Sequence, residues 1–197
     1  MTNHTPSRAG RKATDPVAAE FAVLGMIAAT PEGEIHGYDL SRSFADSALG
    51  KIIRIEPGML YHYLKKLARS EFITTRVEQQ HGRPDRQVHA LTPVGRAALM
   101  EWLSEPVTST REIRLDFLVK LYLAERLDPR HRANLVDVQR RVMRGRAERL
   151  QAQVDDQQPA DPDNAFGDMV LRLRLSQTRA ALEWLDSIPL ASGTLTS

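Results

Sequence analysis

The sequence predicts a mostly α-helical protein with one small β-hairpin, and three observations lead to this fold class. A helix-capping side chain stands before a proline at residues 15–16, 92–93, 128–129 and 161–162, a pattern that begins helices. Much of the chain between these pairs places apolar residues three and four positions apart, as on one helix face. Only FITTRVEQQ and RQVHALT, separated by the turn sequence HGRPD, have the composition of strands.

Composition excludes several classes of protein. With 197 residues, 42% of them apolar, the chain is long enough for one large core or two small ones. Cysteine is absent, which excludes disulfides, thiolate nucleophiles and cysteine-ligated metals and fits a reducing compartment. No run approaches about 18 apolar residues, and the first residues lack the apolar stretch of a secretory signal. We therefore expect a cytoplasmic protein that does not contact a membrane.

The N-terminal elements follow from punctuation by proline and glycine. Residues 1–15 are basic and predict a flexible arm. Helical spacing predicts a helix over residues 17–29 and, after the loop PEGEIHG, a second from residue 37 to about 49. The short apolar run at residues 51–55 is typical of a single strand.

The helix that begins at Pro57 is the most informative element. Its buried stripe is predicted to contain Leu60, Tyr63, Leu64 and Leu67. The opposite face carries Tyr61, His62, Lys65, Lys66 and Arg69. This face is basic, aromatic and almost free of acidic residues, which is what a helix needs to lie against an anionic surface.

Three helices followed by a hairpin is the order of a winged helix-turn-helix. A helix of about 10–12 Å diameter fits the major groove of DNA, and cations at a hairpin tip can contact the backbone or the minor groove. Net charge is only +2, but residues 51–96 hold nine Lys or Arg against four acidic residues. Residues 130–149 are also basic, and their run Arg140–Arg146 fits either a solvated helix face or a contact with phosphate.

Five segments have the order and spacing found in one family. They are AVLGMIA (residues 22–28), HGYDL (36–40), EPGMLYHYLKKLARSEFI (56–73), HGRPDR (81–86) and LTPVGRAALMEWL (91–103). In these segments the chain resembles the PadR-like transcriptional regulators, and DFLVKLYLAERL and LEWLDSI resemble the helical C-terminal part of the longer members. The resemblance implies a DNA-binding domain over residues 16–105, a dimerisation and ligand-sensing domain over 106–197, and no enzymatic activity.

The resemblance also implies a function. We expect a homodimeric repressor that binds a near-palindromic operator in double-stranded DNA and is released by a small aromatic or amphipathic effector. The residues expected to face DNA are Tyr38, Ser41, Gly58, Tyr61, His62, Lys65, Lys66, Arg83 and Arg86. The alternatives are an activator of the same fold, and a winged helix that binds proteins, whose basic face is an ordinary solvated surface.

One position departs from the family pattern in a way that bears on local shape. The family usually has glycine where this chain has Glu71, just before the wing begins. Because glycine is the usual left-handed cap of a helix, its loss predicts that the turn leaving the recognition helix differs in shape.

The last helix predicted, residues 163–188, has two apolar stripes. One contains Leu171, Leu175, Thr178, Leu182 and Leu185, and the other contains Met169, Leu173, Ala180, Trp184 and Ile188. One stripe can pack against the helix predicted over residues 129–154 and the other is free for a second subunit, unless both face one intrachain core. We expect the dimer contacts to come from Leu171, Leu175, Leu182, Trp184 and Leu185.

The sequence gives little evidence for a ligand pocket, a metal site or a catalytic site. The residues that could line an effector pocket are Phe117, Tyr122, His131 and Trp184, each of which could equally be core. The six histidines form no HxH or HExxH pair, and no GxxxxGK[ST], GxGxxG or GxSxG occurs. We expect no catalytic residues, no metal and no cofactor.

Overall fold

The computed structural model describes residues 17–79, 86–156 and 165–189. The elements of the first half are α1 (Ala18–Ala28), β1 (Glu34–His36), α2 (Gly37–Asp46), α3 (Ala48–Ile52), α4 (Pro57–Arg69), β2 (Ile73–Glu78), β3 (Arg86–Leu91) and α5 (Pro93–Ser104). Those of the second half are α6 (Thr110–Glu112), the π-helical turn η1 (Ile113–Phe117), α7 (Leu118–Leu127), α8 (Pro129–Asp155) and α9 (Ala165–Ser187). The mostly helical fold with a small β-wing is confirmed, and the N-terminal arm expected at residues 1–15 lies outside the described residues.

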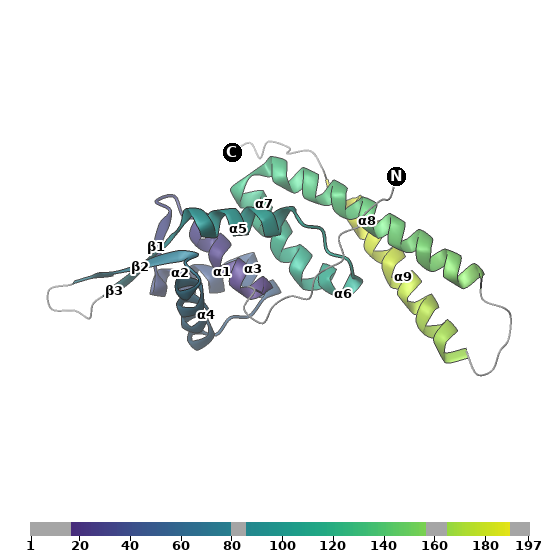
Figure 1. Ribbon diagram of the computed structural model, residues 1–197, viewed down its shortest axis with the longest axis horizontal. Coiled ribbons are helices and arrows are strands. Elements are labelled where there is room, and N and C mark those ends of the chain that lie inside the picture. The colour runs from purple at the N-terminus through teal and green to yellow at the C-terminus, as the bar shows by residue number, and fades with distance from the viewer. Residues whose placement is uncertain (1–16, 80–85, 157–164, 190–197) are drawn as a thin grey trace.

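The molecule is elongated, with the wing at one end and the α8–α9 pair at the other (Figure 1). The sheet has the order β1-β3-β2, and both pairs are antiparallel. The prediction of a strand at residues 51–55 is wrong, because Lys51 and Ile52 are the last residues of α3. The strand that joins the hairpin in the sheet is instead β1. A three-residue strand has no periodicity of its own and forms here because β3 supplies its hydrogen-bond partners.

Two of the four helix starts predicted from a capping side chain and a proline are confirmed, and the other two pairs, at residues 15–16 and 161–162, lie outside the described residues. Thr92 and Asp128 cap α5 and α8, accepting hydrogen bonds from the backbone N–H groups of Gly95 and Arg130, and a proline follows each cap. The single helix expected over residues 37–49 is instead two, because Ser47 is extended and its side chain caps α3.

Two cores meet at α7. Val119 and Leu123 pack with the apolar residues of α1, α4 and α5, whereas Phe117 and Ala124 pack with those of α8 and α9. Gly25 of α1 permits this contact, since a Cβ there would lie 2.4 Å from the Leu123 side chain. Helix α7 therefore joins the expected DNA-binding and C-terminal domains.

Helices α8 and α9 lie side by side and antiparallel (Figure 1). Near the middle of α8, the guanidinium of Arg140 donates to the carbonyls of Leu185, Asp186 and Ile188 and so caps the C-terminal end of α9. Of the helices that the structure describes, none is long and apolar enough to cross a membrane.

Candidate nucleic-acid interface

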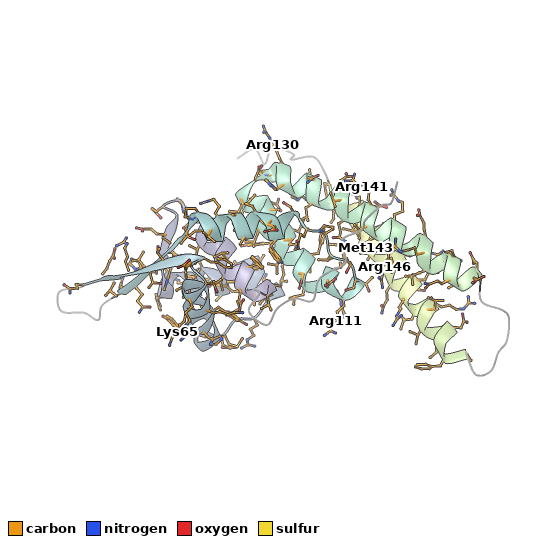
Figure 2. All side chains as sticks on the ribbon, in the orientation of Figure 1. Lys65, Arg111, Arg130, Arg141, Met143 and Arg146 are labelled. Carbon is orange, nitrogen blue, oxygen red and sulfur yellow. The ribbon has the colours of Figure 1, made fainter. Side chains whose placement is uncertain are left out.

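Helix α4 presents one face to the core and the other to solvent, as its sequence predicts. Leu60, Leu64 and Leu67 are at most 2% exposed and pack against the first core, while Tyr63 is partly buried. The outward residues Gly58, His62, Lys65 and Arg69 are exposed. Figure 2 shows Lys65 projecting away from the molecule.

The turn after α4 keeps the shape that glycine would give it. Glu71 has a φ of 60°, and the N–H groups of Glu71 and Phe72 donate to the carbonyls of Ala68 and Leu67 at 3.1 and 3.0 Å. These are the two hydrogen bonds of a Schellman motif. The expected change of shape is therefore wrong, and a non-glycine residue holds the left-handed conformation at a cost of about 1 kcal/mol.

The two adjacent lysines of α4 have different surroundings. Lys65 is exposed, and no carboxylate pairs with it in the part of the chain described. The Nζ of Lys66 instead donates to both oxygens of Glu20 on α1, at 2.9 and 3.0 Å. Lys66 is thus directed toward α1 rather than toward solvent, and the expectation that it faces DNA does not fit this geometry.

Helix α2 supports α4 from one side. Tyr38 is 72% exposed and Ser41 is partly buried, so the tyrosine remains available to a ligand. The ring of Tyr61 is 49% exposed and lies against the start of α2, where a Cβ on Gly37 would be 3.2 Å from the ring. Tyr61 therefore both contacts α2 and borders the outward face of α4.

The wing is held by charged side chains at its base. Arg76 on β2 forms an ion pair with Glu34 at 2.6 Å, which joins β2 to β1 across β3, and a second one with Glu78 on its own strand. Arg86 is exposed at the start of β3, and none of the described carboxylates pairs with it. Arg83, expected at the tip, lies outside the described residues.

A histidine is buried where the wing meets the helices. His89 is 2% exposed, and its Nδ1 is 3.0 Å from the hydroxyl of Thr75. Burial, followed by the nearby His36, lowers the pKa of His89. No group of three or more potential metal-ligating side chains is found within the described ranges.

The stripe of α9 expected to form the dimer is instead turned toward α8. Leu175 and Leu185 are 5% and 0% exposed, and Leu182 packs at the edge of the second core. Leu171 is also partly buried. The other stripe is largely open: Met169, Leu173 and Trp184 are exposed, as is Phe166 on the same side, whereas Ile188 packs into the second core. The correction arises because periodicity defines two stripes and only packing decides which of them α8 covers.

The four residues expected at an effector pocket do not meet in one place. Phe117 is fully buried and contacts Trp184 edge-to-face, with ring centroids 6.0 Å apart. Tyr122 borders a different cavity, between α7 and α2, and His131 pairs with Asp128 at 3.0 Å. Of these four residues, only Trp184 lines a cavity of about 450 Å³ between α6, η1 and α9.

The same cavity contains residues that the sequence did not single out. Arg111 and Arg114 line it together with Trp184, Gln177 and Ile113. Arg111 projects outward from α6 in Figure 2. A cationic rim beside an indole ring is suited to an anionic aromatic or amphipathic molecule.

The basic run of α8 is mostly occupied within the chain. Arg140 caps α9, Arg141 pairs with Asp137, and Arg146 donates to the carbonyl of Thr108 at 3.3 Å. The sequence left two interpretations of this run open, a solvated helix face and a contact with phosphate. Neither fits Arg140 and Arg146, because both donate hydrogen bonds to distant segments of the chain. Gln139 was also missed: its fully buried amide pairs with both backbone groups of Val107 at 2.8 Å.

Comparison with known proteins gives two regional matches. Residues 23–101 match the PadR-like family of transcriptional regulators, and residues 113–188 match the C-terminal region of the virulence activator alpha family. The negative transcriptional regulator PadR of Bacillus subtilis is 28% identical over 179 residues, covering 86% of this chain and 94% of the relative. A probable transcriptional regulator of Mycobacterium tuberculosis is 28% identical over 165 residues, covering 77% and 87%.

A solved structure is also similar. The crystal structure of Bacillus subtilis PadR in complex with operator DNA has a TM-score of 0.44 and 24% sequence identity, covering 87% of this chain and 96% of that one.

Proposed function

The chain belongs to the PadR-like family of transcriptional regulators, which are not enzymes, and on this premise we propose that it is a cytoplasmic, homodimeric, ligand-responsive repressor. It binds a near-palindromic operator by placing α4 in the major groove and the β2–β3 wing along the adjacent backbone. The observation that carries this proposal is the outward face of α4, where exposed Lys65 and Arg69 lack carboxylate partners among the described residues.

The geometry of this face supports recognition of the DNA base sequence as well as attraction to phosphate. His62 and Tyr61 offer ring donors and acceptors next to Lys65, and Gly58 leaves open space at the start of the helix. Base edges in the major groove are read by such polar side chains, while lysines and arginines neutralise phosphates. Tyr38, Ser41, Arg83 and Arg86 complete the proposed contacts from α2 and the wing.

Repression rather than activation is supported by the relative named a negative transcriptional regulator, which aligns over most of both chains. A repressor needs only to occupy its operator, and a ligand that lowers affinity for DNA then restores transcription. An exposed cationic helix face argues against the alternative of a protein-binding winged helix, because protein interfaces are depleted of lysine at their centres.

The dimer is supported by the open stripe of α9. Phe166, Met169 and Leu173 are 72%, 58% and 56% exposed on one side of the helix, which is unusual for large apolar residues in a solvated chain. A two-fold axis would bring the same stripe of a second copy against it and would place two α4 helices on one duplex. One α4 and one wing contact too few base pairs for specific binding.

The effector is proposed to bind in the cavity that Trp184 lines. Its indole ring and the guanidinium groups of Arg111 and Arg114 suit a small aromatic or amphipathic anion. Through η1 this site is continuous with α7, which packs on α1 of the DNA-binding half. Quenching of tryptophan fluorescence by a phenolic carboxylate, lost in Trp184→Phe, is the direct test.

DNA binding is tested by the dependence of affinity on salt. We expect the protein to bind duplex DNA from upstream of its own gene, with log K falling steeply against log salt. Lys65→Ala should flatten that slope by about two units per dimer, because each subunit loses one phosphate contact. Arg130→Ala is the matched control, since Arg130 projects from the opposite side of the molecule in Figure 2.

Two outcomes would contradict the proposal. One is a slope near zero for the wild-type protein, which would show that it makes no phosphate contacts. The other is equal slopes for the Lys65 and Arg130 variants, which would show that α4 does not face the duplex.

A further inference from the structure

Glu20 is a buried carboxylate whose contacts connect two helices. It lies on α1 and its side chain is 3% exposed. One oxygen accepts the backbone N–H of Val17 at 3.1 Å, and both accept the ammonium of Lys66 on α4. Burying a charged carboxylate is costly unless an opposite charge and hydrogen bonds compensate it. Lys66 is therefore held firmly at this position.

The position of Lys66 around α4 matters more than the strength of its ion pair. At about 100° per residue, Leu60, Leu64 and Leu67 occupy one side of α4, and His62, Lys65 and Arg69 occupy the other. Lys66 and Tyr61 lie at the two edges between these sides. Lys66 is tied to Glu20 at one edge, and Tyr61 rests on Gly37 at the other.

Apolar packing alone leaves the rotation of a helix weakly determined, because contacts among leucine side chains are not directional. A hydrogen-bonded ion pair at the edge of the stripe is directional and resists rolling of the helix toward that edge. A roll of one helix by a small angle displaces every outward side chain relative to the bases.

We propose that Glu20 is a positioning residue for DNA recognition: it holds Lys66 against α1 and thereby fixes the rotation of α4 that presents His62 and Lys65 to the groove. This inference rests on the proposed DNA-binding function. It also assigns Lys66 a different role from Lys65, its neighbour, although both are lysines on the same helix.

The test uses Glu20→Gln, Lys66→Gln, the double variant, and Lys65→Gln as the matched control. Affinity for the upstream duplex is measured over a range of salt concentrations. We expect Glu20→Gln and Lys66→Gln each to weaken specific binding by about tenfold without changing the salt slope, and the double variant to be no weaker than either. Lys65→Gln should instead flatten the slope.

The opposite pattern would overturn the proposal. If Lys66→Gln flattens the slope as Lys65→Gln does while Glu20→Gln binds as tightly as the wild type or more tightly, Lys66 contacts phosphate and Glu20 only restrains it. The reversed pair Glu20→Lys with Lys66→Glu guards against loss of folding. Recovery of affinity in a folded reversed pair supports positioning, and a folded reversed pair that binds no better than Lys66→Gln contradicts it.

A second readout does not depend on DNA. Hydrogen exchange of the α4 amides should be faster in Glu20→Gln and Lys66→Gln than in Lys65→Gln, since only the first two release the helix edge. Unchanged exchange would refute positioning even if DNA binding were confirmed. Absence of duplex binding by the wild-type protein would refute the proposed function and leave this measurement to decide the inference.

Discussion

The two halves of the molecule differ in what they leave exposed. In the first half, the apolar side chains of α1, α4 and α5 pack into one core, and α4 turns His62 and Lys65 outward. In the second half, the first turns of α9 expose Phe166, Met169 and Leu173. The first half also exposes apolar residues such as Val77 and Val94, but these lie on different elements, whereas those of α9 share one face that an apolar partner could cover.

This difference indicates that the two halves of the chain are suited to different kinds of partner. Exposed cations stay solvated and are close to neutral for folding, so they remain available to an external anion. Exposed apolar area is unfavourable by roughly 25 cal/mol per Å², so it favours assembly with another apolar surface. Helix α7 links the two by packing into both cores.

The largest expected effect tests whether the inner stripe of α9 is core. Leu185→Ala removes a side chain that is 0% exposed and should lower the free energy of unfolding by about 2–5 kcal/mol. Urea unfolding followed by circular dichroism measures this loss, with Glu183→Ala on the exposed side of α9 as control. Equal stability of the two variants would mean that the inner stripe is not packed as described.

The next effect tests the outer stripe. Leu173→Glu should leave circular dichroism and monomer folding unchanged, since Leu173 is 56% exposed, but should abolish the dimer and with it specific binding to DNA. Analytical ultracentrifugation measures the assembly state. The same substitution at Leu182, which packs at the edge of the core, should instead destabilise the chain. If the Leu173→Glu protein sediments as a dimer, the open stripe of α9 is not part of the dimer interface.

A smaller effect concerns His89, a buried polar residue of the first half. The pKa of His89 is lowered in the folded state, so the unfolded chain binds a proton that the folded chain excludes. The free energy of unfolding should therefore reach its highest value above pH about 6.5, the pKa of histidine in the unfolded chain. It should decrease as the pH falls below that value. His89→Gln should lose this dependence, and His131→Gln, at the surface, should keep it. Parallel pH profiles for wild type and His89→Gln would contradict the assignment.

The smallest effect is a gain of stability next to the proposed interface. Glu71→Gly places a residue without a Cβ at a φ of 60° and should stabilise the fold by about 0.5–1 kcal/mol. Thermal unfolding measures the gain, with Glu105→Gly, at extended backbone, as control. A loss of stability in Glu71→Gly would show that the left-handed turn is not strained.

Local patterns were enough to predict several elements of the fold. The periodicity of Leu60, Leu64 and Leu67 gave the phase of α4, and Thr92 and Asp128 gave two helix starts. Each of these depends on residues within four positions of one another. The hairpin was equally predictable, because strand composition and a turn sequence lie next to each other.

Features that depend on distant partners could not be predicted in this way. The strand β1 exists because β3 pairs with it, and Lys66 turns inward because Glu20, 46 residues away in sequence, is buried beside it. Arg140 caps a helix that ends more than forty residues later. In each case the local sequence is compatible with more than one environment.

The sequence by itself determined which residues share a face of each helix, because helical geometry fixes that relation at short range. The tertiary structure decided which face of α9 is covered, which lysine of α4 is paired and which aromatic residue lines the cavity beside α6. The physical reason is that periodicity places side chains around an axis, whereas burial and ion pairing depend on segments that only folding brings alongside.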